Sequence, residues 1–164
     1  MKRVLTAMVV AGTMAGTWMV ALAEDAAVAY PDGYRDWHHV KSMVIEEGHA
    51  LYGAFGGIHH LYANEAAVQG YRTGQFPDGA VIVFDLLAAE DAGNALTEGA
   101  RKVVGVMERD AGRFGDTGGW GFEGFGGGDP ENRVVGADAA TACFGCHAPQ
   151  ESTQYVFSTM RDGE

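Results

Sequence analysis

The chain has 164 residues, of which 47% are hydrophobic, and its formal net charge at pH 7 is -11. This length suits a single domain with a real hydrophobic core, and the hydrophobic content excludes a disordered chain. An acidic surface repels nucleic acid and anionic lipid, and it attracts a basic partner or a cationic substrate at low salt. Solubility alone is a sufficient reason for such a charge.

The first 23 residues have the pattern of an export signal. A basic start precedes the uncharged and mostly apolar residues 4–20, and an Ala-x-Ala site ends at Ala23. A retained membrane anchor is the alternative, but a span needs about 20 apolar residues and this stretch contains several small ones. We predict a cleaved signal peptide over residues 1–23, a mature domain over residues 24–164, and a periplasmic location without membrane attachment.

The first half of the mature chain predicts two strands separated by a loop. Residues 37–45 are rich in β-forming side chains and follow a turn, so they predict a strand. Residues 46–57 are glycine-rich and predict a loop. Residues 57–63 predict a second strand, in which the alternation of side chains puts His59 on one face and His60 on the other.

A short helix and a buried strand are expected next. Asn64 is a suitable N-cap for a helix over residues 65–72, and Gly74 can end that helix with a positive φ. Residues 76–79 have the composition of a turn. Residues 80–87 are almost continuously apolar and predict a strand that is buried on both faces.

The next segments add further strand character. Residues 90–99 are polar and predict a linker, and residues 101–107 predict another strand. In residues 118–125 large side chains are separated by glycines, which allows aromatic rings to lie flat against a neighbouring strand or a planar cofactor. Together these elements predict an α+β fold, mostly antiparallel sheet with a few short helices.

The C-terminal part carries the most specific motif of the sequence. Asp138 can cap a short helix over residues 139–146, and residues 155–158 have strand character that would close the sheet. Within this part lies Cys143-Phe144-Gly145-Cys146-His147, a Cys-x-x-Cys-His attachment site for c-type haem near the C-terminus.

The chemistry of haem attachment needs these residue types at this spacing. The thiols of Cys143 and Cys146 add to the two vinyl groups of one haem, and the imidazole of His147 then lies beneath the iron. A zinc half-site, a redox pair and a disulfide are the alternatives. A zinc site would require about two more ligands at matching spacing, and a redox pair normally lies early in a βαβ unit. The predicted export supports haem, because c-type haem is attached outside the bacterial cytoplasm.

The position of the motif narrows the class of cytochrome. Small electron carriers have the motif near the start of the chain and a methionine ligand later, whereas only seventeen residues follow His147. Met160, Met43 and Met107 are the methionines considered as a second iron ligand, but no other feature of the sequence supports methionine ligation. A C-terminal motif resembles the c-prime cytochromes, but their four-helix bundle requires long amphipathic helices that this sequence does not contain.

Several segments taken together resemble the cytochrome P-460 family, which includes the β-sheet form called cytochrome c-prime-beta. The resemblance covers essentially the whole mature chain, and its segments are residues 34–37, 71–79, 117–122, 143–147 and 155–158. It implies a homodimer with a largely antiparallel sheet. It also implies one five-coordinate c-type haem, held by Cys143 and Cys146, with His147 as the proximal ligand.

The same resemblance implies two possible activities. The P-460 enzymes oxidise hydroxylamine and carry an extra lysine cross-link to the haem, whereas the c-prime-beta proteins bind nitric oxide or carbon monoxide in an apolar pocket. Where the cross-linking lysine is expected, this chain has Tyr71 and Arg72. The mature chain contains only Lys41 and Lys102, and a guanidinium is a poor nucleophile. An oxidative cross-link through Tyr71 is chemically conceivable.

We therefore predict a haem protein whose open iron position binds nitric oxide or a similar small nitrogenous or diatomic ligand. The alternatives are hydroxylamine or nitric oxide oxidation, with electrons leaving to a redox partner protein, and a six-coordinate electron carrier with Met160 or His60 as the sixth ligand. Candidate residues of the distal pocket are His59, His60, Tyr71 and Arg72. Candidates for a distal carboxylate base are Asp85, Glu108 and Glu123.

Overall fold

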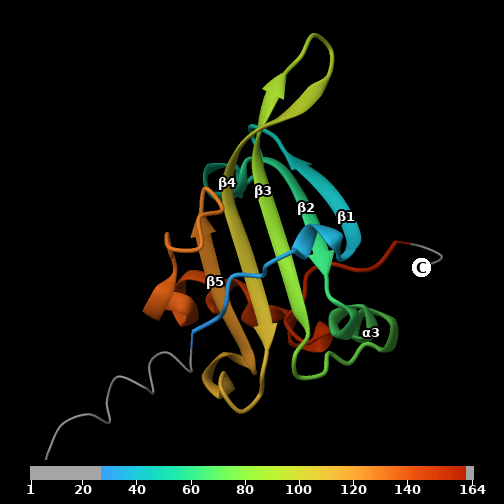
Figure 1. Cartoon of the computed structure of the whole chain (residues 1–164), viewed down its shortest axis with the longest axis vertical. Coiled ribbons are helices and arrows are strands. Elements are labelled where there is room, and N and C mark those ends of the chain that lie inside the picture. The colour runs from blue at the N-terminus through green and yellow to red at the C-terminus, as the bar shows by residue number, and fades with distance from the viewer. Residues whose placement is uncertain (1–26, 162–164) are drawn as a thin grey trace, which may run out of the picture.

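Five antiparallel strands form one sheet in the order β1-β2-β3-β4-β5, so each strand lies beside its neighbour in the sequence (Figure 1). The structure is a computed structural model, and it describes residues 27–161. The predicted α+β class with a mostly antiparallel sheet is confirmed. The strands are β1 (His38–Ile45), β2 (Gly57–Ala63), β3 (Val81–Asp91), β4 (Leu96–Arg109) and β5 (Trp120–Gly126).

The helices are short and lie mostly before β3 or after β5. They are η1 (Tyr34–Asp36), α2 (Tyr52–Phe55), α3 (Glu65–Thr73), η2 (Gly115–Thr117), η3 (Gly136–Asp138), η4 (Ala140–Phe144), α4 (Gly145–His147) and η5 (Ala148–Thr153). Within residues 27–161, none of them has the length and apolar character needed to span a membrane. The predicted signal peptide over residues 1–23 lies outside the described residues.

Helix α3 has the caps that the sequence predicts. The Asn64 side chain accepts a hydrogen bond from the backbone N–H of Ala67 at 2.9 Å, and Gly74 adopts a φ of 74°. The Asn64 carboxamide oxygen also accepts the N–H of Val81 at 3.0 Å, which fixes the helix to the start of β3. Local side-chain chemistry therefore sets both ends of this helix.

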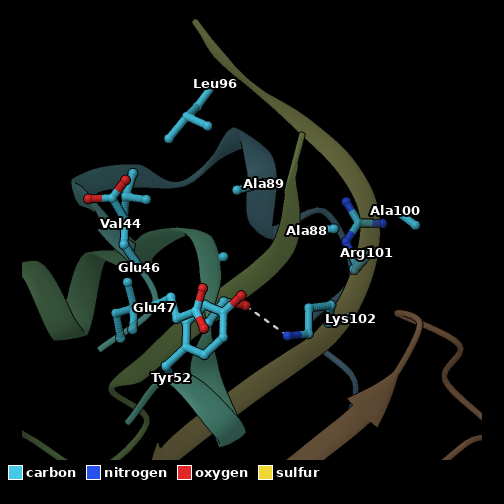
Figure 2. A pocket seen from close by; sticks show the side chains of 13 residues that line it. Val44, Glu46, Glu47, Tyr52, Ala88, Ala89, Leu96, Ala100, Arg101 and Lys102 are labelled. Carbon is cyan, nitrogen blue, oxygen red and sulfur yellow. Dashed lines mark hydrogen bonds between the residues drawn. The ribbon is translucent and has the colours of Figure 1, made fainter. Parts of the chain in front are cut away.

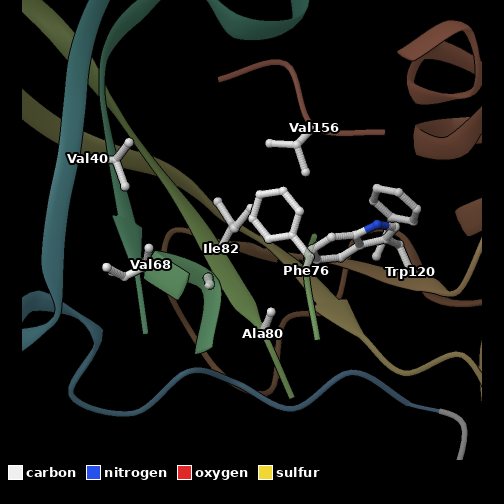
Figure 3. Close-up of a cluster of buried hydrophobic side chains, with 10 residues drawn as sticks. Val40, Val68, Phe76, Ala80, Ile82, Trp120 and Val156 are labelled. Carbon is white, nitrogen blue, oxygen red and sulfur yellow. The ribbon is translucent and has the colours of Figure 1, made fainter. Parts of the chain in front are cut away.

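The two faces of the sheet are covered by the two ends of the chain. Figure 1 shows the N-terminal segment crossing one face and the C-terminal helices crossing the other. We call these the N-terminal face, which carries Val83 and Val104, and the C-terminal face, which carries Ile82 and Phe122. A buried cluster lies between the C-terminal face, α3 and the C-terminal tail (Figure 3); its members are Val40, Ala63, Ala67, Val68, Phe76, Ala80, Ile82, Trp120, Phe122 and Val156.

The predicted polar linker over residues 90–99 is wrong, because β3 and β4 continue through it as a hairpin. Asp91 pairs with Leu96, Ala92 N–H donates to the carbonyl oxygen of Ala95 at 2.8 Å, and at the centre of this turn Gly93 and Asn94 have φ values of 68° and 66°. Glycine and asparagine tolerate positive φ, which this tight turn requires. The segment is polar because the hairpin projects beyond the rest of the sheet (Figure 1), so both of its faces meet solvent.

The predicted strand over residues 155–158 is also wrong. Gln154 and Tyr155 have φ values of 52° and 67°, which turn the chain away from an extended path. The carbonyl oxygen of Tyr155 then accepts a hydrogen bond from the ring of His147 instead of pairing with a strand. The segment crosses the C-terminal face as an irregular tail.

The predicted cap by Asp138 is not found. Asp138 lies within η3, and the following Ala139 already has helical backbone angles, so position 138 is not the start of the helix. The helical segment from residue 140 begins with a wide π-helical turn, η4, without a side-chain cap. Such wide turns frequently occur at functional sites.

Candidate haem site

His147 is held in the orientation and tautomer that a metal ligand needs. Its Nδ1 lies 2.7 Å from the carbonyl oxygen of Tyr155, and a carbonyl can only accept, so Nδ1 carries the proton. The ring packs between Phe122 and Phe157, at centroid distances of 5.0 and 4.8 Å. Burial lowers the pKa of His147, against the opposing effect of the Tyr155 carbonyl. The neutral ring therefore keeps the lone pair of Nε2 for an external ligand.

The two thiols lie on the same helical segment as His147. Cys143 is half-buried against the core cluster and Cys146 is exposed, and both are unpaired. Burial raises the pKa of the Cys143 thiol, and Glu123 and Cys146 add to this effect. Within the described part of the chain, no group of three or more His, Cys, Asp or Glu side chains could hold a metal ion. Cys143 and Cys146 therefore lack the further ligands among the described residues that a zinc site on these thiols would need.

Beside His147 the C-terminal face has an apolar area with little cover. One row of paired residues begins at Lys41 on β1 and continues through Leu61, Phe84, Gly105 and Gly124, and we call these last four residues the open row. The adjacent row contains Phe122, against which His147 packs. The first three members of the open row are only half-buried, whereas Val83, Val104 and Val106 on the other face of β3 and β4 are buried.

Gly105 leaves the middle of the open row without a covering side chain. The nearest atoms to a Cβ placed on Gly105 belong to Phe84, at 3.5 Å or more, so a side chain at this position would project over the open row. At the border with His147, the Phe157 side chain is 59% exposed. An uncovered apolar surface with an exposed aromatic ring beside two free thiols and a prepared imidazole suits a flat apolar cofactor such as haem.

The structure separates the two predicted histidines. His59 lies on the C-terminal face, is 2% exposed, and its ring is 4.6 Å from that of Phe84. Its Nδ1 is buried and has no hydrogen-bond partner among residues 27–161. Burial lowers the pKa of His59, with a smaller contribution from His60. His60 lies on the N-terminal face, directly opposite Ser42 on β1, and does not share a face with His147.

Tyr71 reaches the edge of the site, whereas Arg72 does not. The Tyr71 hydroxyl forms a 2.6 Å hydrogen bond with Ser158 Oγ, next to the Phe157 ring that packs on His147. Burial raises the pKa of Tyr71 to about 12, although the Ser158 contact acts in the opposite direction. Arg72 is exposed in the last turn of α3.

The three candidate carboxylates do not share the face of His147. Asp85 pairs with Val104, Glu123 with Val106 and Glu108 with Val81, and these positions all belong to the N-terminal face.

The sequence did not predict the open row or the contact of Phe157 with His147. Strand alternation alone could have assigned the faces of the carboxylates relative to their neighbours, but the face that the haem motif covers depends on the fold.

Glu123 fixes the segment that leads into the thiol-bearing helix. Its Oε1 accepts the backbone N–H groups of Gly124, Val135 and Gly136 at 2.8, 3.0 and 3.2 Å, and Arg133 contacts Oε2 at 3.2 Å. Burial by itself would raise the pKa of Glu123, but these donors outweigh it and the pKa is lowered. The carboxylate therefore stabilises the fold above the pKa of an unfolded glutamate, and this contribution is lost as the pH falls through the lower folded value.

We predict that Glu123→Gln lowers the free energy of unfolding at pH 7 by about 1–3 kcal/mol, because the amide cannot accept all of these bonds. Urea unfolding between pH 3 and 7 measures this, and the variant should lose less stability than the native protein as the pH falls. The exposed Glu131→Gln removes the same charge and serves as the control. Equal effects of the two substitutions would contradict a positioning role for Glu123.

A separate hollow of about 510 Å³ lies between the end of β1, α2 and the base of the projecting hairpin (Figure 2). Tyr52, Glu46 and Glu47 line it together with Lys102, whose Nζ donates to the carbonyl oxygen of Gly56 at 2.7 Å. It contains no histidine or cysteine, so it does not compete with the site around His147.

Comparison with known sequences gives a match to a protein family. A sequence model of the family described as Cytochrome P460 matches residues 31–158. The matched range includes all five strands, the two cysteines and His147. Among curated proteins, none matches the chain.

Proposed function

Since the chain belongs to the cytochrome P460 family and is thus a c-type haem protein, we propose that it carries one haem in the periplasm, attached through Cys143 and Cys146, with His147 as the axial ligand. The observation that supports this proposal most directly is the Nδ1 contact of His147 with the Tyr155 carbonyl, since it frees Nε2 for iron. The open row provides the apolar surface for the macrocycle.

We propose that the protein binds nitric oxide or a similar small ligand. The haem, held by Cys143, Cys146 and His147, would supply an iron that can bind the ligand. Phe84 of the open row forms an edge-to-face pair with Phe55, with the ring centroids 5.7 Å apart. These two rings would make the surroundings of the bound ligand apolar. An apolar pocket favours an uncharged diatomic ligand over a charged one.

The alternatives have less support. Hydroxylamine oxidation in this family uses a cross-linking lysine and a distal carboxylate, but the three candidate carboxylates lie on the N-terminal face. Lys41 donates to Thr159, and Lys102 donates to a backbone carbonyl in the separate hollow. The carrier alternative requires a sixth ligand. His60 faces the opposite side of the sheet and does not share a face with His147.

Optical spectra of the purified holoprotein test this proposal. We expect a high-spin ferric and ferrous spectrum that changes when nitric oxide is added, with no hydroxylamine turnover above that of free haem. A low-spin spectrum that is indifferent to nitric oxide would leave only the electron carrier. A strongly red-shifted reduced Soret band with hydroxylamine turnover would instead support the enzyme.

We assign His59 as the polar group of the ligand pocket, because its buried Nδ1 lacks a partner and its ring contacts Phe84. His59→Leu should speed nitric oxide release by roughly two- to tenfold, the equivalent of one neutral hydrogen bond. Stopped-flow release kinetics measure it. His60→Leu, one position along β2 and on the other face, is the matched control and should leave the rate unchanged. Equal rates in His59→Leu and the native protein would refute the assignment.

A further inference from the structure

A chain of hydrogen bonds connects two histidines on the N-terminal face, remote from His147. Ser42 Oγ lies 2.9 Å from His39 Nε2 and 2.6 Å from His60 Nδ1. His60 Nε2 lies 2.6 Å from Glu98 Oε1, and Arg161 NH2 lies 3.1 Å from His39 Nδ1. Residues from β1, β2, the projecting hairpin and the C-terminal tail therefore meet here.

The partners fix the protons of both rings. The Glu98 carboxylate accepts, so His60 carries its proton on Nε2, and the lone pair of Nδ1 points at Ser42. The Arg161 guanidinium can only donate, so His39 Nδ1 accepts and the His39 proton lies on Nε2. The Ser42 hydroxyl accepts from His39 and donates to His60.

Two imidazole nitrogens from adjacent strands thus converge on one small, exposed oxygen atom. The two rings lie 5.6 Å apart, and Ser42 is exposed, so an ion from solvent can reach the point between them. Glu98 orients His60 in the way that carboxylates orient metal-bound histidines. The net charge of -11 raises the local concentration of cations.

We propose that His39 Nε2 and His60 Nδ1 bind one divalent transition-metal ion, Cu²⁺ more tightly than Zn²⁺, with Ser42 Oγ or water completing the coordination. Imidazole suits both ions, and Cu²⁺ forms the stronger complexes of the two. Because metal–nitrogen bonds are about 2.0–2.1 Å long, the ion would take the present position of the Ser42 oxygen, and the Ser42 side chain would rotate aside before its hydroxyl or water completes the coordination. On binding, His39 releases its Nε2 proton to solvent and takes up a proton at Nδ1, so that the ring stays neutral.

Arg161 gives this proposal a distinctive prediction. In the metal-bound form Nδ1 of His39 no longer offers a lone pair to Arg161, and the guanidinium charge opposes the ion. Removing that charge with Arg161→Gln should therefore strengthen Cu²⁺ binding. Removing the orienting carboxylate with Glu98→Gln should weaken it by about 10–100-fold, as is usual for partners of metal-bound histidines.

Titration of the holoprotein with Cu²⁺, followed by calorimetry and electron paramagnetic resonance, tests the site. We expect one equivalent with hyperfine coupling to two nitrogens, and His39→Ala or His60→Ala should abolish the two-nitrogen signal. His49→Ala removes an exposed histidine in the loop before α2 and is the control. Unchanged binding in both His39→Ala and His60→Ala, or tighter binding in Glu98→Gln, would overturn the proposal. Cu²⁺ binding is measured without any haem ligand, so the result tests this metal site independently of the proposed nitric oxide binding.

Discussion

Replacing both Cys143 and Cys146 by alanine is expected to make the haem extractable with acidic acetone, whereas in the native protein it stays with the polypeptide. The thioether bonds would be the only covalent links, because a histidine ligand is protonated and released in acid. Each single variant should retain one link and one free vinyl group, which shifts the pyridine haemochrome spectrum. Mass spectrometry of the intact chain gives an independent measure.

His147→Ala is the matched control, because it removes the axial ligand and leaves both thiols. Its haem should resist extraction while its spectrum loses the imidazole-ligated form. Haem that resisted extraction in the double cysteine variant would contradict attachment by the thiols alone. A third link would then exist, and Tyr71→Phe would identify it, because the Tyr71 hydroxyl lies at the edge of the site on Ser158.

Local signals in the sequence predicted the parts of the fold that depend on neighbouring residues. The strand predicted over residues 57–63 has the observed bounds, and the caps of α3 are Asn64 and Gly74 as expected. The alternation that separates His59 from His60 also follows from the sequence, because side chains alternate in every strand.

The remaining features depend on contacts between distant segments. Composition favoured a linker over residues 90–99, yet pairing between β3 and β4 continues there because the turn at Gly93 permits it. Strand propensity predicted a strand over residues 155–158, yet the Tyr155 carbonyl accepts a hydrogen bond from the His147 ring instead of pairing with a strand. Similarly, no local pattern indicates which sheet face the C-terminal helices cover, so the open row could not be found from the sequence.

Asp85 illustrates how a carboxylate proposed for chemistry serves the fold instead. Its side chain is buried and accepts hydrogen bonds from Tyr34 at 2.7 Å, Arg35 at 3.0 Å and Arg101 Nε at 2.7 Å. These partners come from η1 and from β4, so the contacts join the N-terminal segment to the middle of the sheet. Burial and the hydrogen bond to Asp85 raise the pKa of Tyr34 well above its usual value.

Asp85→Ala is therefore expected to lower the free energy of unfolding by about 3–5 kcal/mol, since it leaves the partly buried Arg101 cation without its acceptor. Urea unfolding should show a lower midpoint with an unchanged slope. Glu108→Ala, which breaks a more exposed ion pair with Arg113, should cost less than about 1 kcal/mol. The nitric oxide affinity of folded Asp85→Ala should equal that of the native protein, because Asp85 lies on the N-terminal face. A changed affinity with little loss of stability would indicate that Asp85 contacts the ligand, and it would refute the placement of Asp85 on the face opposite His147.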